Sequence, residues 1–317
     1  MSVISNLPVI PNRLYLILKQ IASYRSGIER GSLEEMMNPP SLMKGKKTNI
    51  FSEVLNEAMR LGLIIEITNE TEEKKLKLAS DVQKLDEIDF IRLMEQRLLQ
   101  DSSNTLWNRG RFPEALTWFL IQDPLKPFMW DKNVRSIVEN DISDESESFE
   151  LTNKARFQNL IYWARFLGYA VKLGFTATEI SDDTDIDEDE SQTADQDAVK
   201  ATAYVLPDPT TAIARYLPAI FNDKTQLSVS ELIQAWASFL PVLEGGSIRE
   251  SLEQQVRPEL ARQDRTFSKA TSLALRRLAQ RKIIQLKTLS DADMHLLDYG
   301  RETTRVSHIV YLGEQSV

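Results

Sequence analysis

Apolar residues recur at helical spacing along much of the chain, and several of these stretches lead into a short segment suited to a strand. Three segments align by eye on this pattern: residues 54–67, 160–173 and 274–287. Each has an apolar helix face, then a turn, and then a β-branched or otherwise apolar run. Because the spacing between them is irregular, a solenoid of fixed period is excluded. The pattern predicts an α+β protein, mainly α with small β-hairpins, built from tandem units.

The first predicted unit, residues 1–82, has three helices followed by a hairpin. Its helices are expected over residues 11–24, 32–37 and 49–61. Gly62 ends the third helix, and the runs 64–67 and 75–78 pair as strands across a turn-rich tip. Three helices and a two-stranded wing are typical of a winged helix-turn-helix unit, so we expect one here.

Residues 83–206 predict a helical segment followed by a second winged-helix-like unit. Its long helix is expected over 151–172, and its strands over 175–178 and 201–206. Between the strands lies an acidic run, about 181–197, which predicts a disordered and self-repelling wing tip. The first two helices of this unit are hard to separate in the sequence.

The third predicted unit, residues 207–317, centres on a basic helix. Preceding helices are expected over residues 209–217, 228–240 and 247–256. Thr266 or Ser268 can cap the basic helix, whose apolar face is formed by Ala274, Leu275, Leu278 and Ala279. Strand-like runs at 283–286 and 306–312 follow it. This is the layout of a recognition helix and its wing, which gives three tandem winged helices in all.

The net charge of −9 conceals a basic segment near the C-terminus. Residues 245–288 hold ten Lys or Arg and four Asp or Glu, whereas residues 181–190 hold seven acids and no base. A DNA phosphate responds to charges within a Debye length of about 8–10 Å. The basic helix can therefore contact nucleic acid although the chain as a whole is acidic.

Cations on the basic helix and just before it are the predicted DNA-binding residues. From a major groove they would reach phosphates or base edges. They are Arg262, Arg265, Lys269, Arg276, Arg277 and Arg281. Two other interpretations stay open, a solvated helix face and a docking surface for an acidic protein.

The N-terminal unit carries a second group of cations that could contact a partner or DNA. They are Lys44, Lys46, Lys47, Lys74 and Lys75. The third helix of this unit also carries Glu53 and Glu57, which would repel phosphate. Protein–protein contact is therefore as good an interpretation here as DNA contact.

No catalytic, metal or cofactor site is predicted. The acidic run lacks the turn glycine of a calcium loop. The two histidines, His295 and His308, have no accompanying nucleophile, glycine-rich phosphate loop or metal-ligand spacing. The chain has no Cys, no apolar run near 20 residues and no signal-peptide pattern. These features predict a cytoplasmic, non-enzymatic protein without a membrane or small-molecule partner.

The N-terminal unit resembles a known family. The segment NLPVIPNRLYLILKQIA (6–22), leading into NIFSEVLNEAMRLGLIIEI (49–67), is similar to the G component of bacterial Dpd gene clusters. Those clusters place 7-deazaguanine bases in DNA and restrict DNA that lacks them. The resemblance implies an accessory subunit of an anti-phage modification–restriction system, working beside nucleases and helicases. It brings no catalytic motif and therefore no active-site residues.

These observations predict a non-enzymatic protein that binds duplex DNA through its third unit and other subunits through the remaining units. The alternative is an adaptor whose winged helices dock proteins without touching DNA, as in acidic accessory subunits of chromosome-organising ATPase complexes. A third alternative is an enzyme without a recognisable motif. The acidic run adds the possibility of an autoinhibitory segment that folds back on the basic helix.

Overall fold

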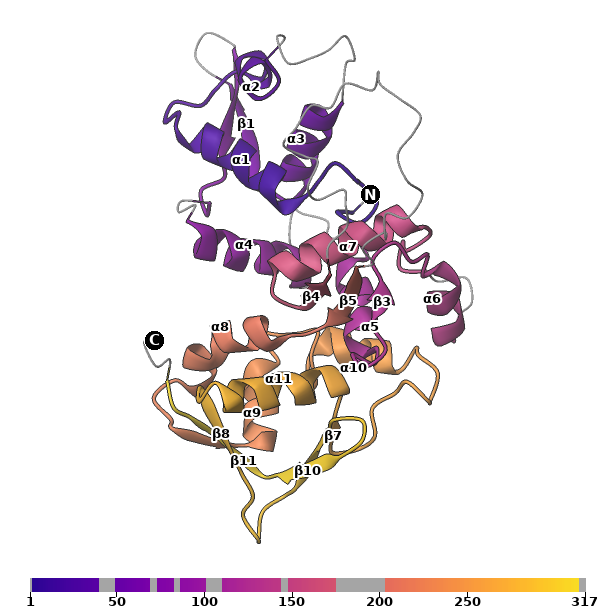
Figure 1. The fold of residues 1–317 in the computed structure, drawn as a ribbon. Coiled ribbons are helices and arrows are strands. Elements are labelled where there is room, and N and C mark those ends of the chain that lie inside the picture. The colour runs from indigo at the N-terminus through magenta and orange to yellow at the C-terminus, as the bar shows by residue number, and fades with distance from the viewer. Residues whose placement is uncertain are drawn as a thin grey trace, which may run out of the picture.

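The computed structural model describes residues 2–39, 49–68, 73–82, 86–100, 110–143, 148–174 and 203–313. Within these ranges it contains eleven helices and eleven short strands, arranged in four small sheets (Figure 1). This confirms the predicted α+β class. One buried apolar cluster runs through all parts of the described chain. None of the described helices has the length and apolar content needed to cross a bilayer.

The N-terminal part has the predicted order of three helices and a hairpin. The elements are α1 (Pro11–Ala22), α2 (Arg30–Met37), α3 (Ile50–Arg60), β1 (Ile64–Thr68) and β2 (Lys74–Leu78). One residue between α1 and α2, Ile28, forms a β-bridge with Leu76 of β2. Strand β2 therefore lies between Ile28 and β1. The apolar stripe of α1 is buried, as its helical spacing predicts.

The middle part begins with a helix that packs between the other parts and continues with a three-stranded sheet. The elements are α4 (Glu87–Leu99), α5 (Phe112–Ile121), β3 (Phe128–Met129), α6 (Arg135–Asp141), α7 (Lys154–Phe166), β4 (Ala170–Leu173) and β5 (Tyr204–Pro207). The predicted helix over 151–172 is too long, because Gly168 adopts φ +83° and ends it, so that β4 follows at once. The predicted strand over 175–178 lies outside the described residues, as does the acidic run.

The C-terminal part contains two three-stranded sheets. Its elements are α8 (Thr210–Phe221), β6 (Gln226–Ser228), α9 (Val229–Trp236), α10 (Ser247–Glu253), β7 (Thr266–Phe267), α11 (Lys269–Gln280), β8 (Ile284–Lys287), β9 (His295–Asp298), β10 (Thr303–Val306) and β11 (His308–Tyr311). The sequence did not predict β6, β7, β9 or β10. Helix α8 also continues past Pro218, where we expected it to end. A proline there removes a single helical hydrogen bond, and the following Ile220 and Phe221 are buried.

The three parts share one topology. Each contains the order helix, strand or bridge, helix, helix, strand, strand, which α4 precedes in the middle part, and the last strand of this order lies at the centre of its sheet. The sheet orders are Ile28–β2–β1, β3–β5–β4 and β6–β11–β8. In the third part, α10 and β7 are added before the last helix, and β9 and β10 are added between the last two strands. The assignment of these parts as winged helices, with boundaries at 82/83 and 206/207, stays a prediction.

The last helix of each part ends in the same way, which gives the aligned sequence segments a structural cause. Gly62, Gly168 and Lys282 have φ values of +64°, +83° and +57°. The residue after each donates its backbone N–H to the carbonyl five residues earlier, at 2.9, 2.8 and 3.0 Å. This is the Schellman pattern, which turns the chain directly from helix into strand. Two of the three positions are glycine, which adopts positive φ without a steric penalty.

Candidate functional site

Helix α11 is the element on which the predicted DNA-binding site depends. Ser268 caps it, since its hydroxyl accepts from the Thr271 N–H, and Ala274, Leu275 and Leu278 are fully buried beneath it. The helix packs against α8, β8 and β9, and its first turns also approach α5 (Figure 1). Much of its surface is therefore covered by the protein itself.

The N-terminus of α11 is occupied by a carboxylate from within the chain. Glu244 is 0% exposed and accepts hydrogen bonds from the Ser268 N–H (2.9 Å) and the Thr271 hydroxyl (2.8 Å). Burial alone would raise the pKa of Glu244, but the Arg249 guanidinium at 4.0 Å and the hydrogen bonds from Ser268 outweigh it and lower the pKa. A helix N-terminus is a common site for phosphate. Here the Glu244 carboxylate already occupies this site.

Two predicted DNA-binding cations bind carboxylates in the middle part or at its junction with the C-terminal part. Lys269 donates to Asp123, just after α5, at 2.6 Å. Arg277 forms an ion pair with Asp208, which follows β5 and is itself buried. Partial burial would raise the pKa of Asp123, but hydrogen bonds from Lys269 and Leu125 bring it below its usual value. The Lys269–Asp123 pair joins the third part of the chain to the second, and the Arg277–Asp208 pair holds α11 to the junction between β5 and α8.

Three further predicted cations bind carboxylates within the C-terminal part. Arg276 donates to Glu302 at 2.5 Å, and its guanidinium lies 4.7 Å from the centre of the Tyr299 ring. Arg265 pairs with Asp293 at 3.2 Å, and Arg262 lies 3.8 Å from Glu253. The partner acids come from loops and helix ends outside α11.

Arg281 differs from the other five predicted residues. It is the C-cap residue of α11, its side chain is exposed, and it has no ion pair among the described residues. Lys282 follows it and is also exposed. The structure thus leaves two neighbouring cations at the end of α11 open to solvent.

The N-terminal cations are only partly within the described residues. Lys44, Lys46 and Lys47 lie outside them. Lys74 pairs with Glu66 at 2.8 Å, and Lys75 lies 3.7 Å from Glu73. Both pairs belong to the hairpin region of β1 and β2. The side chain of Lys74 is exposed, so its ammonium group remains accessible to solvent although it is paired with Glu66.

A family model described as DpdG-like matches residues 1–292 of the chain. The chain belongs to the DpdG-like family. The match covers all three parts of this DpdG-like protein up to the loop between β8 and β9. No curated protein and no solved structure matches it.

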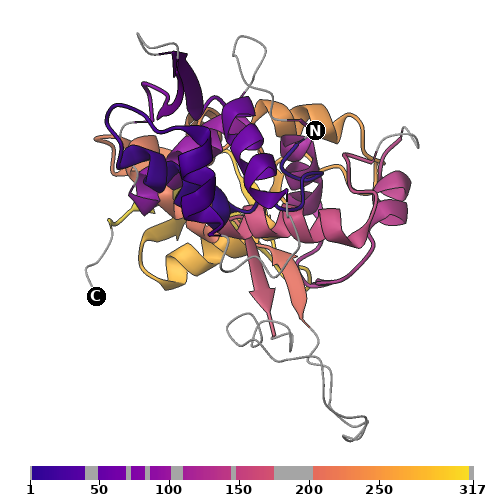
Figure 2. The same cartoon turned by 90° about the horizontal axis from the view of Figure 1, so that it is seen from above.

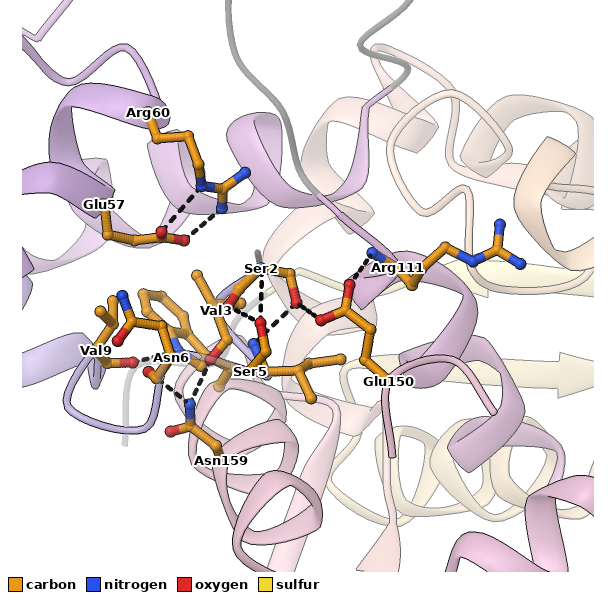
Figure 3. A network of polar contacts seen from close by, with 12 residues as sticks. Ser2, Val3, Ser5, Asn6, Val9, Glu57, Arg60, Arg111, Glu150 and Asn159 are labelled. Carbon is orange, nitrogen blue, oxygen red and sulfur yellow. Dashed lines mark hydrogen bonds and ion pairs between the residues drawn. The ribbon is translucent and has the colours of Figure 1, made fainter. Parts of the chain in front are cut away.

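Sequence reasoning missed the anchoring of the N-terminal segment of the DpdG-like protein. Residues 2–9 lie against the middle part, and Ser2, Val3 and Ile4 are fully buried (Figure 3). Ser2 donates its hydroxyl to Glu150 at 2.5 Å, and Glu150 also accepts from the Arg111 N–H at 3.3 Å. The apolar residues of this segment were visible in the sequence, but its distant partners were not.

Two side chains of α7 hold the same segment from below. The Asn159 amide donates to the carbonyls of Val3 and, at 3.2 Å, Asn6. The Trp163 indole donates to the Val9 carbonyl at 2.9 Å. These contacts join residues about 150 positions apart and fix the start of α1 over α7 (Figures 1 and 3).

A second buried polar cluster joins α4 to α8. Glu95 accepts from Arg215 at 2.6 Å and from the Tyr216 hydroxyl at 2.6 Å. Burial raises the pKa of Glu95, although Arg215 and Tyr216 oppose the effect. Burial and the Glu95 charge raise the pKa of Tyr169, which lies in the same cluster. The bonds from Arg215 and Tyr216 satisfy the Glu95 carboxylate within an otherwise apolar interface.

The histidines lie in the C-terminal sheets. His295 is buried in β9 near the Phe267 ring, and burial lowers its pKa. His308 lies in β11, with Nδ1 at 3.0 Å from the Ser307 hydroxyl. Among the residues that the structure describes, no three His, Cys, Asp or Glu side chains gather as a metal site would require.

Proposed function

We propose that this DpdG-like protein is a non-catalytic adaptor of a Dpd defence complex, with three tandem winged helices that dock other protein subunits. The observation that carries the proposal is the pairing of the predicted DNA-binding cations. Five of the six, all but Arg281, already lie against carboxylates of the same chain. Family membership supports the Dpd context.

Pairing with an internal carboxylate reduces the free energy that a cation can gain by binding a phosphate. Binding to DNA is driven by cations that replace condensed counterions around phosphates. A cation beside its own carboxylate presents little net charge, and the carboxylate repels the phosphate. The effect is weak for exposed pairs such as Arg265–Asp293, which solvent screens. It is strongest for Arg277, whose partner Asp208 is buried and would lose its counter-charge.

DNA binding through the third part is the second candidate, and the open pair Arg281 and Lys282 favours it. Both side chains are exposed, at the end of the helix that a winged helix would use for recognition. In this case the predicted set, Arg262, Arg265, Lys269, Arg276, Arg277 and Arg281, would contact DNA after exchanging its internal partners for phosphates.

A salt titration of duplex-DNA binding separates the two candidates. Fluorescence anisotropy of a labelled duplex would be followed between about 50 and 200 mM salt, where contacts to several phosphates cost orders of magnitude in affinity. The adaptor predicts weak binding, unaffected by Arg281→Ala combined with Lys282→Ala. Tight binding with a steep salt slope, weakened by that double substitution, would establish the DNA candidate instead.

The adaptor also predicts a stable partner. The tagged chain would be co-expressed with the other proteins of its Dpd cluster and purified at about 200 mM salt, which weakens non-specific electrostatic contacts. We expect at least one of them to remain bound in constant stoichiometry through size-exclusion chromatography. Elution of the chain alone in every combination would refute the adaptor.

A further inference from the structure

Strand β4 forms one edge of the middle sheet. The order is β3–β5–β4, and none of the strands that the structure describes pairs with the outer edge of β4. The Asp208 N–H donates to the Tyr169 carbonyl at 2.9 Å, just before the paired residues Ala170 and Pro207. Because backbone groups alternate between the two edges of a strand, those of Ala170 and Lys172 face away from β5.

A groove of about 540 Å³ lies beside this edge. Ala170 and Lys172 line it together with the start of α1 and one side of α7, including Ile10, Tyr162 and Arg165. No acidic residue lines the groove. Arg165 is exposed and has no ion pair among the described residues, so the groove carries uncompensated positive charge.

The other face of the same sheet carries an exposed apolar row. Leu173, Tyr204 and Met129 are direct neighbours on β4, β5 and β3, and they are 50%, 40% and 44% exposed. Figure 2 shows β4 and β5 side by side, extending away from the helices. Cross-strand neighbours point to the same face, so this row ends at the edge of β4.

We propose that the outer edge of β4 binds an extended segment of a partner protein in which acidic and apolar residues alternate. The segment would add a fourth strand to the sheet by backbone hydrogen bonds. Its acidic side chains would face the groove and meet Arg165, while its apolar side chains would continue the row of Leu173, Tyr204 and Met129. Both faces of the sheet then match the two faces of the bound strand.

This inference deepens the proposed adaptor role by naming a docking surface and the chemistry of its partner. The two can fail separately. Steep, salt-dependent DNA binding would refute the adaptor role and leave peptide binding at β4 unchanged, whereas loss of peptide binding would leave other docking surfaces available to an adaptor.

The probe is a fluorescein-labelled peptide of eight residues in which glutamate and isoleucine alternate, measured by anisotropy with the full-length protein. Two N-methylated forms provide the decisive comparison. In paired antiparallel strands, the residues that face the groove are those whose backbone meets Ala170 and Lys172. Methylation of the glutamate amides should therefore abolish binding, and methylation of the isoleucine amides should leave it within about twofold.

A matched pair of charge reversals on α7 tests the groove itself. Arg165→Glu should weaken peptide binding roughly tenfold or more, since a charge-assisted contact is replaced by repulsion. Lys154→Glu makes the same change on the exposed first turn of the same helix, about 16 Å away, and should have no effect. The proposal is overturned by absent saturable binding, by equal binding of both methylated peptides, or by equal effects of the two reversals.

Discussion

Lys282 occupies a left-handed backbone position at which the two related parts of the chain carry glycine. Its φ is +57°, and the adjoining hydrogen bonds match those around Gly62 and Gly168. A side chain with a Cβ in this region costs about 1–2 kcal/mol relative to a right-handed residue. Glycine removes that cost but loses about 0.4–1 kcal/mol through the greater freedom of the unfolded chain. Lys282→Gly should therefore raise the free energy of unfolding by roughly 0.5–1 kcal/mol.

The control separates backbone strain from charge. Lys282→Ala removes the same ammonium group but keeps the Cβ in the left-handed region, so it should be no more stable than the wild type. Thermal melts and urea unfolding of the three proteins would be compared, and a gain of this size corresponds to about 1–3 °C for a chain of this length. If the glycine and alanine variants were equally stable, the shared helix-ending motif would not explain the strain assigned to Lys282.

Three further predictions concern other contacts of the fold. Asn159→Ala should destabilise the protein by about 1–3 kcal/mol in urea unfolding, since it leaves buried carbonyls of the N-terminal segment without a donor, whereas Gln158→Ala on the same helix should have little effect. Arg276→Ala combined with Arg277→Ala should lower the melting temperature, because Asp208 stays buried without its partner. The same double substitution should leave DNA affinity within about twofold. A large loss of affinity would support the DNA candidate. Glu95 has a raised pKa in the folded state, so its contribution to stability falls as pH rises from about 4.5 through that raised value. Glu95→Gln should remove this pH-dependent contribution from the free energy of unfolding. Identical plots of that free energy against pH for the two proteins would contradict the prediction.

Local elements of this fold could be predicted from the sequence to a large extent. The apolar stripes of α1 and α3, the order of helices and hairpin in the first part, and the recurring helix-to-strand turn all follow from short-range patterns. Elements of two or three residues, such as β3, β6 and β7, carry too little periodicity to be recognised. They form because longer strands already offer an edge, as β5, β11 and β9 do.

The contacts between parts could not be predicted, because they join residues far apart in the chain. In the sequence, Asn159 is one polar residue within an apolar helix, and only the fold places its amide beside the carbonyls of Val3 and Asn6. Glu95 likewise reads as part of a solvated helix face, yet it is buried against Arg215. What allows a polar residue to be buried is a hydrogen-bonding partner. In both cases this partner lies more than 100 positions away in the sequence.

The same limit applies to the charge of α11, because the local sequence does not show which of its cations pair with acids of the same chain. Residues 245–288 contain a clear excess of cations, but most of the acids that pair with the predicted DNA-binding residues lie outside this window. Asp123 comes from the middle part, Asp208 from the junction between β5 and α8, and Asp293 and Glu302 from loops that follow β8. Charges of opposite sign in separate segments attract as the chain folds, so a local excess is the expected origin of internal ion pairs as much as of a DNA-binding face. Only residues that stay unpaired after folding, such as Arg281 at the end of α11 and Arg165 beside β4, keep a charge that a partner can use.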